Sequence, residues 1–81
     1  MKVKLKLFSV AKDLAGFDEQ EIEIPQGSVV EQVLQNLLRS NPRFIDWKQS
    51  LRYAVNLEYV SNTFPLHEGD EVAVIPPVSG G

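Results

Sequence analysis

The sequence contains no cysteine and a single histidine among its 81 residues. Without cysteine there is no disulfide framework, no thiolate zinc site and no thiol nucleophile, which fits a reducing cytosol. His67 lies in the turn-like stretch PLHEGDE, where one imidazole among solvated carboxylates is not a defined metal-ligand set. Neither a Walker A run nor a G-x-G-x-x-G loop is present. These absences argue against a metal site or a catalytic centre built by this chain.

The sequence also lacks long apolar runs and a concentrated basic patch. Its apolar runs are too short to span a bilayer, and MKVKLKLF has neither the apolar region nor the cleavage site of a signal peptide. We therefore expect no membrane partner and a cytoplasmic location. The formal net charge of -3 argues against a nucleic-acid partner. Lys2, Lys4 and Lys6 form the one basic cluster, expected as a solvated strand face, with docking of an acidic partner as the alternative.

Hydrophobic periodicity predicts the elements of the first part of the chain. Lysines alternate with apolar residues over 2–8, KVKLKLF, which is typical of a half-buried strand. Segment 9–16 favours a short helical turn that Ser9 caps and Gly16 ends. Segment 17–24, FDEQEIEI, is a second strand candidate, and the following PQG indicates a turn.

The main helix is predicted over residues 28–40, SVVEQVLQNLLRS. Ser28 and Glu31 match an S-x-x-E capping box, and Asn41-Pro42 ends the helical pattern. The apolar residues recur at helical spacing and form one stripe, consisting of Val30, Val33, Leu34, Leu37 and Leu38.

The second half predicts strands around an ambiguous segment. Residues 43–52 suit either an irregular segment or a short helix. Residues 53–60 read as strand, tight bend and strand, and 65–75 as a turn and a final strand. The order β, β, α, β, β predicts a single α+β domain of the β-grasp (ubiquitin-like) type. In this fold a mixed sheet of four to five strands is covered on one face by the main helix, with the first and last strands adjacent at its centre.

The sequence ends VAVIPPVSGG. Pro76 and Pro77 cannot donate ladder hydrogen bonds, so they end the last strand and favour an extended path. Gly80 and Gly81 have no Cβ and can thread a channel too narrow for other residues. A terminal carboxylate becomes a good electrophile once it carries a leaving group such as AMP. We therefore predict a β-grasp domain over 1–76 and a tail over 77–81, with an unselected frayed end as the alternative.

YAVNLEYV followed by PLHEGDEVAVIPPVSGG resembles the signature of the small, sulfur-carrier subunits of molybdopterin synthase, which are ubiquitin-like β-grasp proteins. LFSVAKDLAG resembles the first strand and following helix of that family, so the resemblance spans nearly the whole chain. It implies that an E1-like enzyme uses ATP to adenylate the C-terminal glycine and that a sulfur donor converts the adenylate to a thiocarboxylate. The tail then enters the large subunit, typically in a heterotetramer, and gives sulfur to cyclic pyranopterin monophosphate.

The resemblance also assigns roles to individual positions. Gly81 bears the sulfur, and Gly80 lets the tip of the tail pass. The remaining positions contact the large subunit: Pro76, Pro77 and Val78 shape the tail, while Phe8, Tyr59 and Ile75 form an apolar docking patch at its base. Some relatives have leucine and phenylalanine where this chain has Tyr59 and Ile75. The alternative for Phe8, Tyr59 and Ile75 is ordinary core packing.

The family's chemistry implies that the chain binds no cofactor itself, because ATP is used by the activating enzyme. It is then a sulfur-donating subunit and is not catalytic alone. Two other interpretations remain open. One is a thiocarboxylate carrier for thiazole synthesis or tRNA thiolation, or a modifier joined to lysines. The other is a β-grasp interaction module whose tail is never activated.

Overall fold

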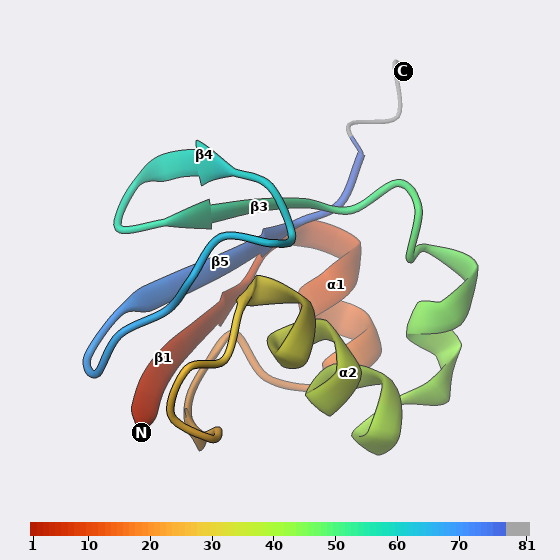
Figure 1. Cartoon of the computed structure of the whole chain (residues 1–81). Coiled ribbons are helices and arrows are strands. Elements are labelled where there is room, and N and C mark those ends of the chain that lie inside the picture. The colour runs from red at the N-terminus through yellow and green to blue at the C-terminus, as the bar shows by residue number, and fades with distance from the viewer. Residues whose placement is uncertain (78–81) are drawn as a thin grey trace.

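The computed structural model describes residues 1–77 and contains one five-stranded sheet in the order β2-β1-β5-β3-β4 (Figure 1). β1 and β5 are parallel and lie next to each other at its centre, and the other neighbours are antiparallel. This arrangement confirms the predicted β-grasp fold. The elements in chain order are β1 (Lys2–Leu7), α1 (Ser9–Ala15), β2 (Glu19–Glu23), α2 (Val30–Ser40), a 3-10 helix (Pro42–Asp46), β3 (Arg52–Val55), β4 (Glu58–Val60) and β5 (Glu71–Ile75).

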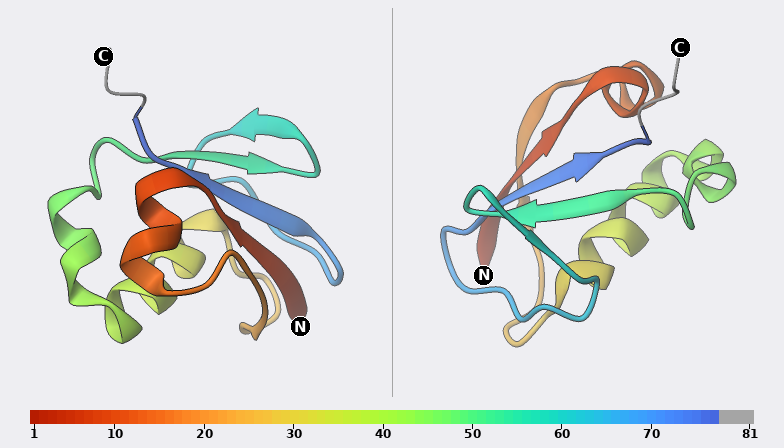
Figure 2. Two further views of the ribbon diagram at one scale, coloured as in Figure 1. Left: turned by 180° about the vertical axis from the view of Figure 1, so that it is seen from behind. Right: turned by 90° about the horizontal axis from the view of Figure 1, so that it is seen from above.

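The core lies between one face of the sheet and the helices, which gather on that side (Figure 2). Strand alternation sends the apolar residues of β1 and β5 inward, where Val3, Leu5, Leu7, Val72 and Val74 are all at most 2% exposed. The apolar stripe of α2 covers them, as the helical spacing predicted. The opposite face of the sheet is left uncovered, and it carries the lysines of β1.

The N-terminus of α2 is satisfied differently from the prediction. The helix begins at Val30, so the predicted Ser28–Glu31 capping box is wrong. The Ser28 hydroxyl instead donates to the Pro25 carbonyl, at 2.7 Å. The first helical N–H groups, of Val30 and Glu31, donate to carbonyls of the loop that follows β4. Because that loop supplies the acceptors, the helix start does not need a side-chain cap from Ser28.

The structure confirms the predicted end of the short helix α1 and contradicts its predicted N-cap. Gly16 ends it with a φ of 84°, and its N–H donates to the carbonyl of Lys12. Ser9 does not cap the helix, because Phe8 occupies the N-cap position and no side-chain hydrogen bond is made there. Ser9 lies inside the first turn with a φ of 54°.

The ambiguous segment after α2 forms the 3-10 helix and a turn that leads into β3. Phe44 is completely buried, Leu51 is buried and Trp47 packs partly buried against the core. The predicted end of α2 at Asn41-Pro42 is confirmed, since the helix stops at Ser40. None of the helices within residues 1–77 has the length and apolar character needed to cross a membrane.

Candidate functional site

The base of the predicted tail lies at the end of β5. Ile75 pairs with Arg52 of β3, Pro76 is buried and Pro77 is exposed. A cleft of about 700 Å³ lies against the two prolines and is also lined by Ile75, Tyr59 and Arg52. Val78, Gly80 and Gly81 lie outside the described residues. The division into a 1–76 domain and a 77–81 tail therefore stays a prediction.

The predicted docking residues lie together on the uncovered face of the sheet. Phe8 is 48% exposed and Tyr59 is 70% exposed, so core packing is the wrong interpretation for both, while Ile75 is partly exposed. Sheet register brings further apolar residues beside them, because Ala54 pairs with both Ala73 and Tyr59. Together they line a hollow of about 240 Å³. We call its apolar lining the docking patch: Phe8, Ala54, Leu57, Tyr59, Ala73 and Ile75.

The lysines of β1 form a solvated ion-pair row, as their alternation predicted. Lys2 and Lys4 pair with Glu21 and Glu19 of β2, at 3.9 and 3.2 Å. A hydrogen bond with Glu19, assisted by its charge, raises the pKa of Lys4 above its ordinary value. Lys6 pairs with Glu71 of β5 at 3.3 Å, and both residues line the hollow beside the docking patch. Such exposed pairs contribute little to stability.

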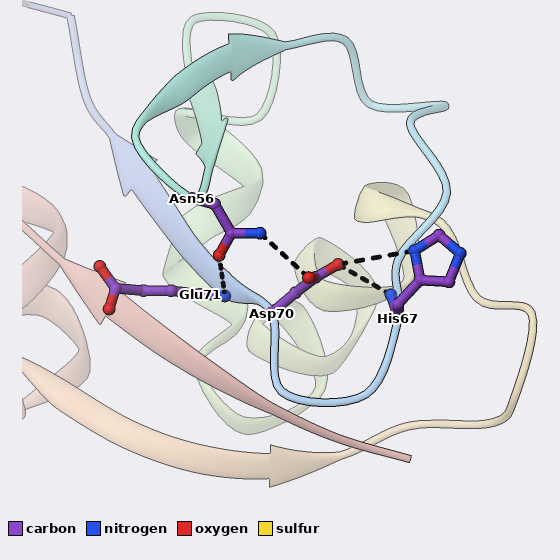
Figure 3. A network of polar contacts seen from close by, with 4 residues as sticks. All are labelled: Asn56, His67, Asp70 and Glu71. Carbon is purple, nitrogen blue, oxygen red and sulfur yellow. Dashed lines mark hydrogen bonds and ion pairs between the residues drawn. The ribbon is translucent and has the colours of Figure 1, made fainter.

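A polar network ties the β3–β4 hairpin to the start of β5 (Figure 3). The side-chain amide of Asn56 donates to Asp70 Oδ1 at 3.0 Å, and its oxygen accepts from the N–H of Glu71 at 3.1 Å. Asp70 Oδ2 also accepts from the N–H of His67 at 2.8 Å. The G-D-E-V turn and the A-V-N strand end, both singled out in the sequence, are therefore bonded to each other.

The network gives His67 a structural setting and no catalytic one. Its ring Nδ1 lies 4.0 Å from Asp70 Oδ2 and is largely exposed. Within residues 1–77, no group of three or more histidine and carboxylate side chains is placed to hold a metal ion. The exposed carboxylates of β2, including Glu21 and Glu23, lie on the surface and line none of the hollows described above.

Tyr53 is the one titratable core residue whose state is strongly set by its surroundings. Its side chain is buried in the core, and its hydroxyl has no hydrogen-bond partner in the described part of the chain. Burial, with a further contribution from the Glu31 charge, raises the pKa of Tyr53 to about 12. Burial thus strengthens the preference of the phenol for its neutral form, which an ordinary tyrosine already has near pH 7.

The geometry thus consists of a tail base, an adjoining apolar hollow and a polar network that fixes one edge of that hollow. The model of the ThiS family matches residues 5–81, which is nearly the whole chain. The chain belongs to the ThiS family. In this ThiS-family chain Phe8, Tyr59 and Ile75 line one surface hollow, and their role in docking stays a prediction.

Relatives of this ThiS-family chain match it from end to end. It is 35% identical over 83 aligned positions to a protein of Chlamydomonas reinhardtii named molybdopterin synthase sulfur carrier subunit, with all of both chains covered. A solved structure from Pyrococcus furiosus, titled putative molybdopterin converting factor, subunit 1, superposes with a TM-score of 0.85 at 37% identity. That match covers 96% of this chain and 99% of that one.

Two further structures extend the comparison. The solution structure of small archaeal modifier protein 1 from Methanosarcina acetivorans has a TM-score of 0.81 at 28% identity, with 99% and 96% of the chains covered. A complex of subunits 1 and 2 of molybdopterin-converting factor from Helicobacter pylori matches over the full length of both chains, with a TM-score of 0.68 at 23% identity. The latter likeness shows the shared fold.

Sequence reasoning missed half of the apolar residues that line the hollow of about 240 Å³. Ala73 could have been predicted from the sequence, because a period of two along the last strand places it on the same face as Ile75. Ala54 follows from the strand pairing, which the sequence does not specify. Leu57 carried no signal of its own, since Asn56 marks the bend but a leucine is not expected at a positive φ.

Proposed function

We propose that this chain is the sulfur carrier subunit of a molybdopterin synthase, in the biosynthesis of the molybdenum cofactor. The observation that carries the proposal is the match, over 99–100% of this chain, to relatives named molybdopterin synthase sulfur carrier subunit. The docking patch supports it, because it offers an apolar surface to a partner beside the base of the tail.

Loading takes place on the carboxylate of Gly81. An E1-like enzyme joins this carboxylate to the α-phosphate of ATP, forming an acyl adenylate and releasing pyrophosphate. Sulfide from a sulfur donor then attacks the acyl carbon and displaces AMP, so that a thiocarboxylate remains. The chain contributes position and access to these steps, since a glycine end leaves the acyl carbon unshielded.

The loaded tail then delivers its sulfur in the large subunit of the synthase. Phe8, Tyr59 and Ile75 hold the domain on the partner while the tail reaches the precursor, cyclic pyranopterin monophosphate. The thiocarboxylate sulfur attacks a carbon of the precursor and displaces an oxygen from it, which gives a thioester between the precursor and Gly81. Water then adds to the acyl carbon and its bond to sulfur breaks, so that the sulfur stays on the precursor and the carboxylate of Gly81 is restored. The acid–base groups for this transfer belong to the partners. We place the cycle in the cytoplasm, where the activating enzyme has ATP.

Intact-mass spectrometry tests the proposal. The chain is incubated with an E1-like activating enzyme, ATP and sulfide, and we expect a mass gain that matches replacement of one oxygen by sulfur, located at Gly81. Adding the large subunit and the pyranopterin precursor then restores the original mass and yields molybdopterin. An unchanged mass with an enzyme that loads a known carrier in parallel would contradict the proposal.

A protein modifier is the second candidate, favoured by the likeness to small archaeal modifier protein 1. A modifier forms an isopeptide bond from Gly81 to lysine side chains of other proteins. Lysine-linked remnants of the tail in cell digests would favour this role, whereas molybdopterin formation in the reconstituted synthase favours the carrier. Both outcomes together would show one chain serving two pathways.

Replacement of Phe8 by alanine is expected to weaken binding of the large subunit more than it lowers stability. Phe8 is 48% exposed and lines the docking hollow, so truncation removes contact area and leaves little cavity in the core. We expect the Kd to rise by about tenfold, the range of an interface anchor. Isothermal titration calorimetry measures the Kd of the wild type and of Phe8→Ala for the large subunit. Thermal melts of the wild type and of Phe8→Ala are the control. A large drop in Tm with an unchanged Kd would show that Phe8 acts as a core residue.

A further inference from the structure

We infer that Leu57, at the tip of the β3–β4 hairpin, is an additional contact for the synthase large subunit, and that the bonded pair Asn56–Asp70 positions it. This inference rests on the proposed function. The resemblance placed docking at Phe8, Tyr59 and Ile75 and gave the hairpin tip no role.

Leu57 has an exposure and a backbone conformation that folding alone does not favour. It is 91% exposed and has a φ of 74°. Asn56 precedes it with a φ of 49°, and the two connect β3 to β4 as a turn with positive φ at both central positions. Such turns prefer Asn-Gly, because a residue with a Cβ is strained there. A leucine at this position adds strain and exposes apolar surface, which indicates selection for a contact.

The polar network fixes the direction in which Leu57 projects. The Asn56 side chain is bonded to Asp70 and to the N–H of Glu71, and the Asn56 N–H donates to the Glu71 carbonyl at 2.9 Å. Figure 3 shows the Asn56 side chain reaching from the hairpin toward the start of β5. Three bonds therefore tie the residue before Leu57 to Asp70 and to Glu71, the first residue of the central strand β5.

The occupant we infer is an apolar side chain of the large subunit. Leu57 lines the same hollow as Phe8, Tyr59 and Ile75, and Tyr59 and Ile75 also line the cleft at the base of the tail. A partner that receives the tail therefore lies against surface continuous with Leu57. The charges within the hollow, Lys6 and Glu71, are paired with each other at 3.3 Å. An apolar group fits this lining better than a charged one.

Two substitutions of Leu57 separate contact from folding. We expect Leu57→Gly to keep or raise the Tm, because glycine relieves the strain at positive φ, while the Kd for the large subunit rises by about tenfold. Leu57→Ala keeps the strain and is expected to weaken binding similarly. Ile45→Ala is the matched control, since Ile45 is 58% exposed on the 3-10 helix and lines no part of the docking hollow. Its Kd is expected to equal that of the wild type.

A double-mutant cycle tests the positioning role of Asn56. Asn56→Gly keeps the required φ and removes both side-chain bonds, and we expect the Kd to rise by roughly fivefold in the wild-type background. If Asn56 acts through Leu57, the same change has little effect in the Leu57→Ala background. If Asn56→Gly raises the Kd by the same factor in the wild-type and Leu57→Ala backgrounds, the positioning role is overturned.

The outcomes distinguish this inference from the proposed function. If the wild type binds the large subunit and Leu57→Gly and Leu57→Ala bind equally well, the Leu57 contact is wrong and the carrier role stands. If the wild type does not bind the large subunit at all, both the carrier role and the contact are overturned.

Discussion

Addition of one alanine after Gly81 is expected to abolish thiocarboxylate formation while the fold stays intact. In the proposed cycle the acyl carbon of Gly81 must reach the α-phosphate of ATP in the activating enzyme. An extra residue replaces the carboxylate of Gly81 with an amide and moves the new carboxylate beyond the expected position. Misplacement of a reacting group by about 1 Å is enough to lower the rate roughly 100-fold. One added residue displaces the carboxylate by more than this distance. Intact-mass spectrometry after incubation with enzyme, ATP and sulfide measures the loss.

Gly81→Ala is the graded control for this experiment. It keeps the carboxylate in place and adds only a methyl group, so we expect slow loading or transfer with an unchanged Tm. Both changes lie outside residues 1–77, so neither alters the sequence of any element that the structure describes. A chain with the extra alanine that loads at the wild-type rate would remove the case for a threaded tail. An interaction module would tolerate both changes.

Phe44→Ala is expected to leave the domain close to unfolding at room temperature. Phe44 is completely buried beneath α2 in the 3-10 helix, and it is among the largest fully buried side chains of the described residues. Truncation of a buried phenylalanine costs about 3–5 kcal/mol in the free energy of unfolding. A small domain without disulfides or metal has only about 5 kcal/mol to lose. Urea unfolding followed by circular dichroism measures the change.

The neighbouring Ile45 supplies the control for this prediction. Ile45 lies in the same 3-10 helix but is 58% exposed, so Ile45→Ala is expected to change the free energy of unfolding by less than about 0.5 kcal/mol. Similar losses for the two variants would show that the helix itself, rather than the packing of Phe44, holds this region.

The fold was predictable because its strongest patterns agree with one another. The alternation of β1 and the apolar stripe of α2 each define a buried face, and the two faces meet in the core. One detail that failed depends on contacts made far along the chain. Ser28 was expected to cap α2, but carbonyls of the loop after β4 accept the first helical N–H groups. Propensity at Ser28 cannot report a partner that folding brings from elsewhere.

The candidate site also contains some residues that the sequence predicted and others that it did not. Phe8, Tyr59 and Ile75 were placed by resemblance, and strand alternation supports their shared face. Leu57 was missed because its role depends on positive φ, a state that sequence patterns assign to glycine or asparagine. The network that holds Asn56 joins two motifs that were noticed separately, and only the pairing of β3 with β5 brings them together.

The parallel pairing of β1 with β5 has a consequence for biosynthesis. It joins Lys4 of the first strand to Glu71 of the last strand of the sheet, which is synthesised much later. Pairings of such long sequence separation form slowly, and this one cannot form until β5 has been synthesised. A nascent chain stalled before β5 has no central strand, and its docking hollow lacks Ala73 and Ile75. Only a chain that has been synthesised through β5 can present the complete hollow to a partner. Docking therefore selects chains that have been made as far as the residues just before the tail.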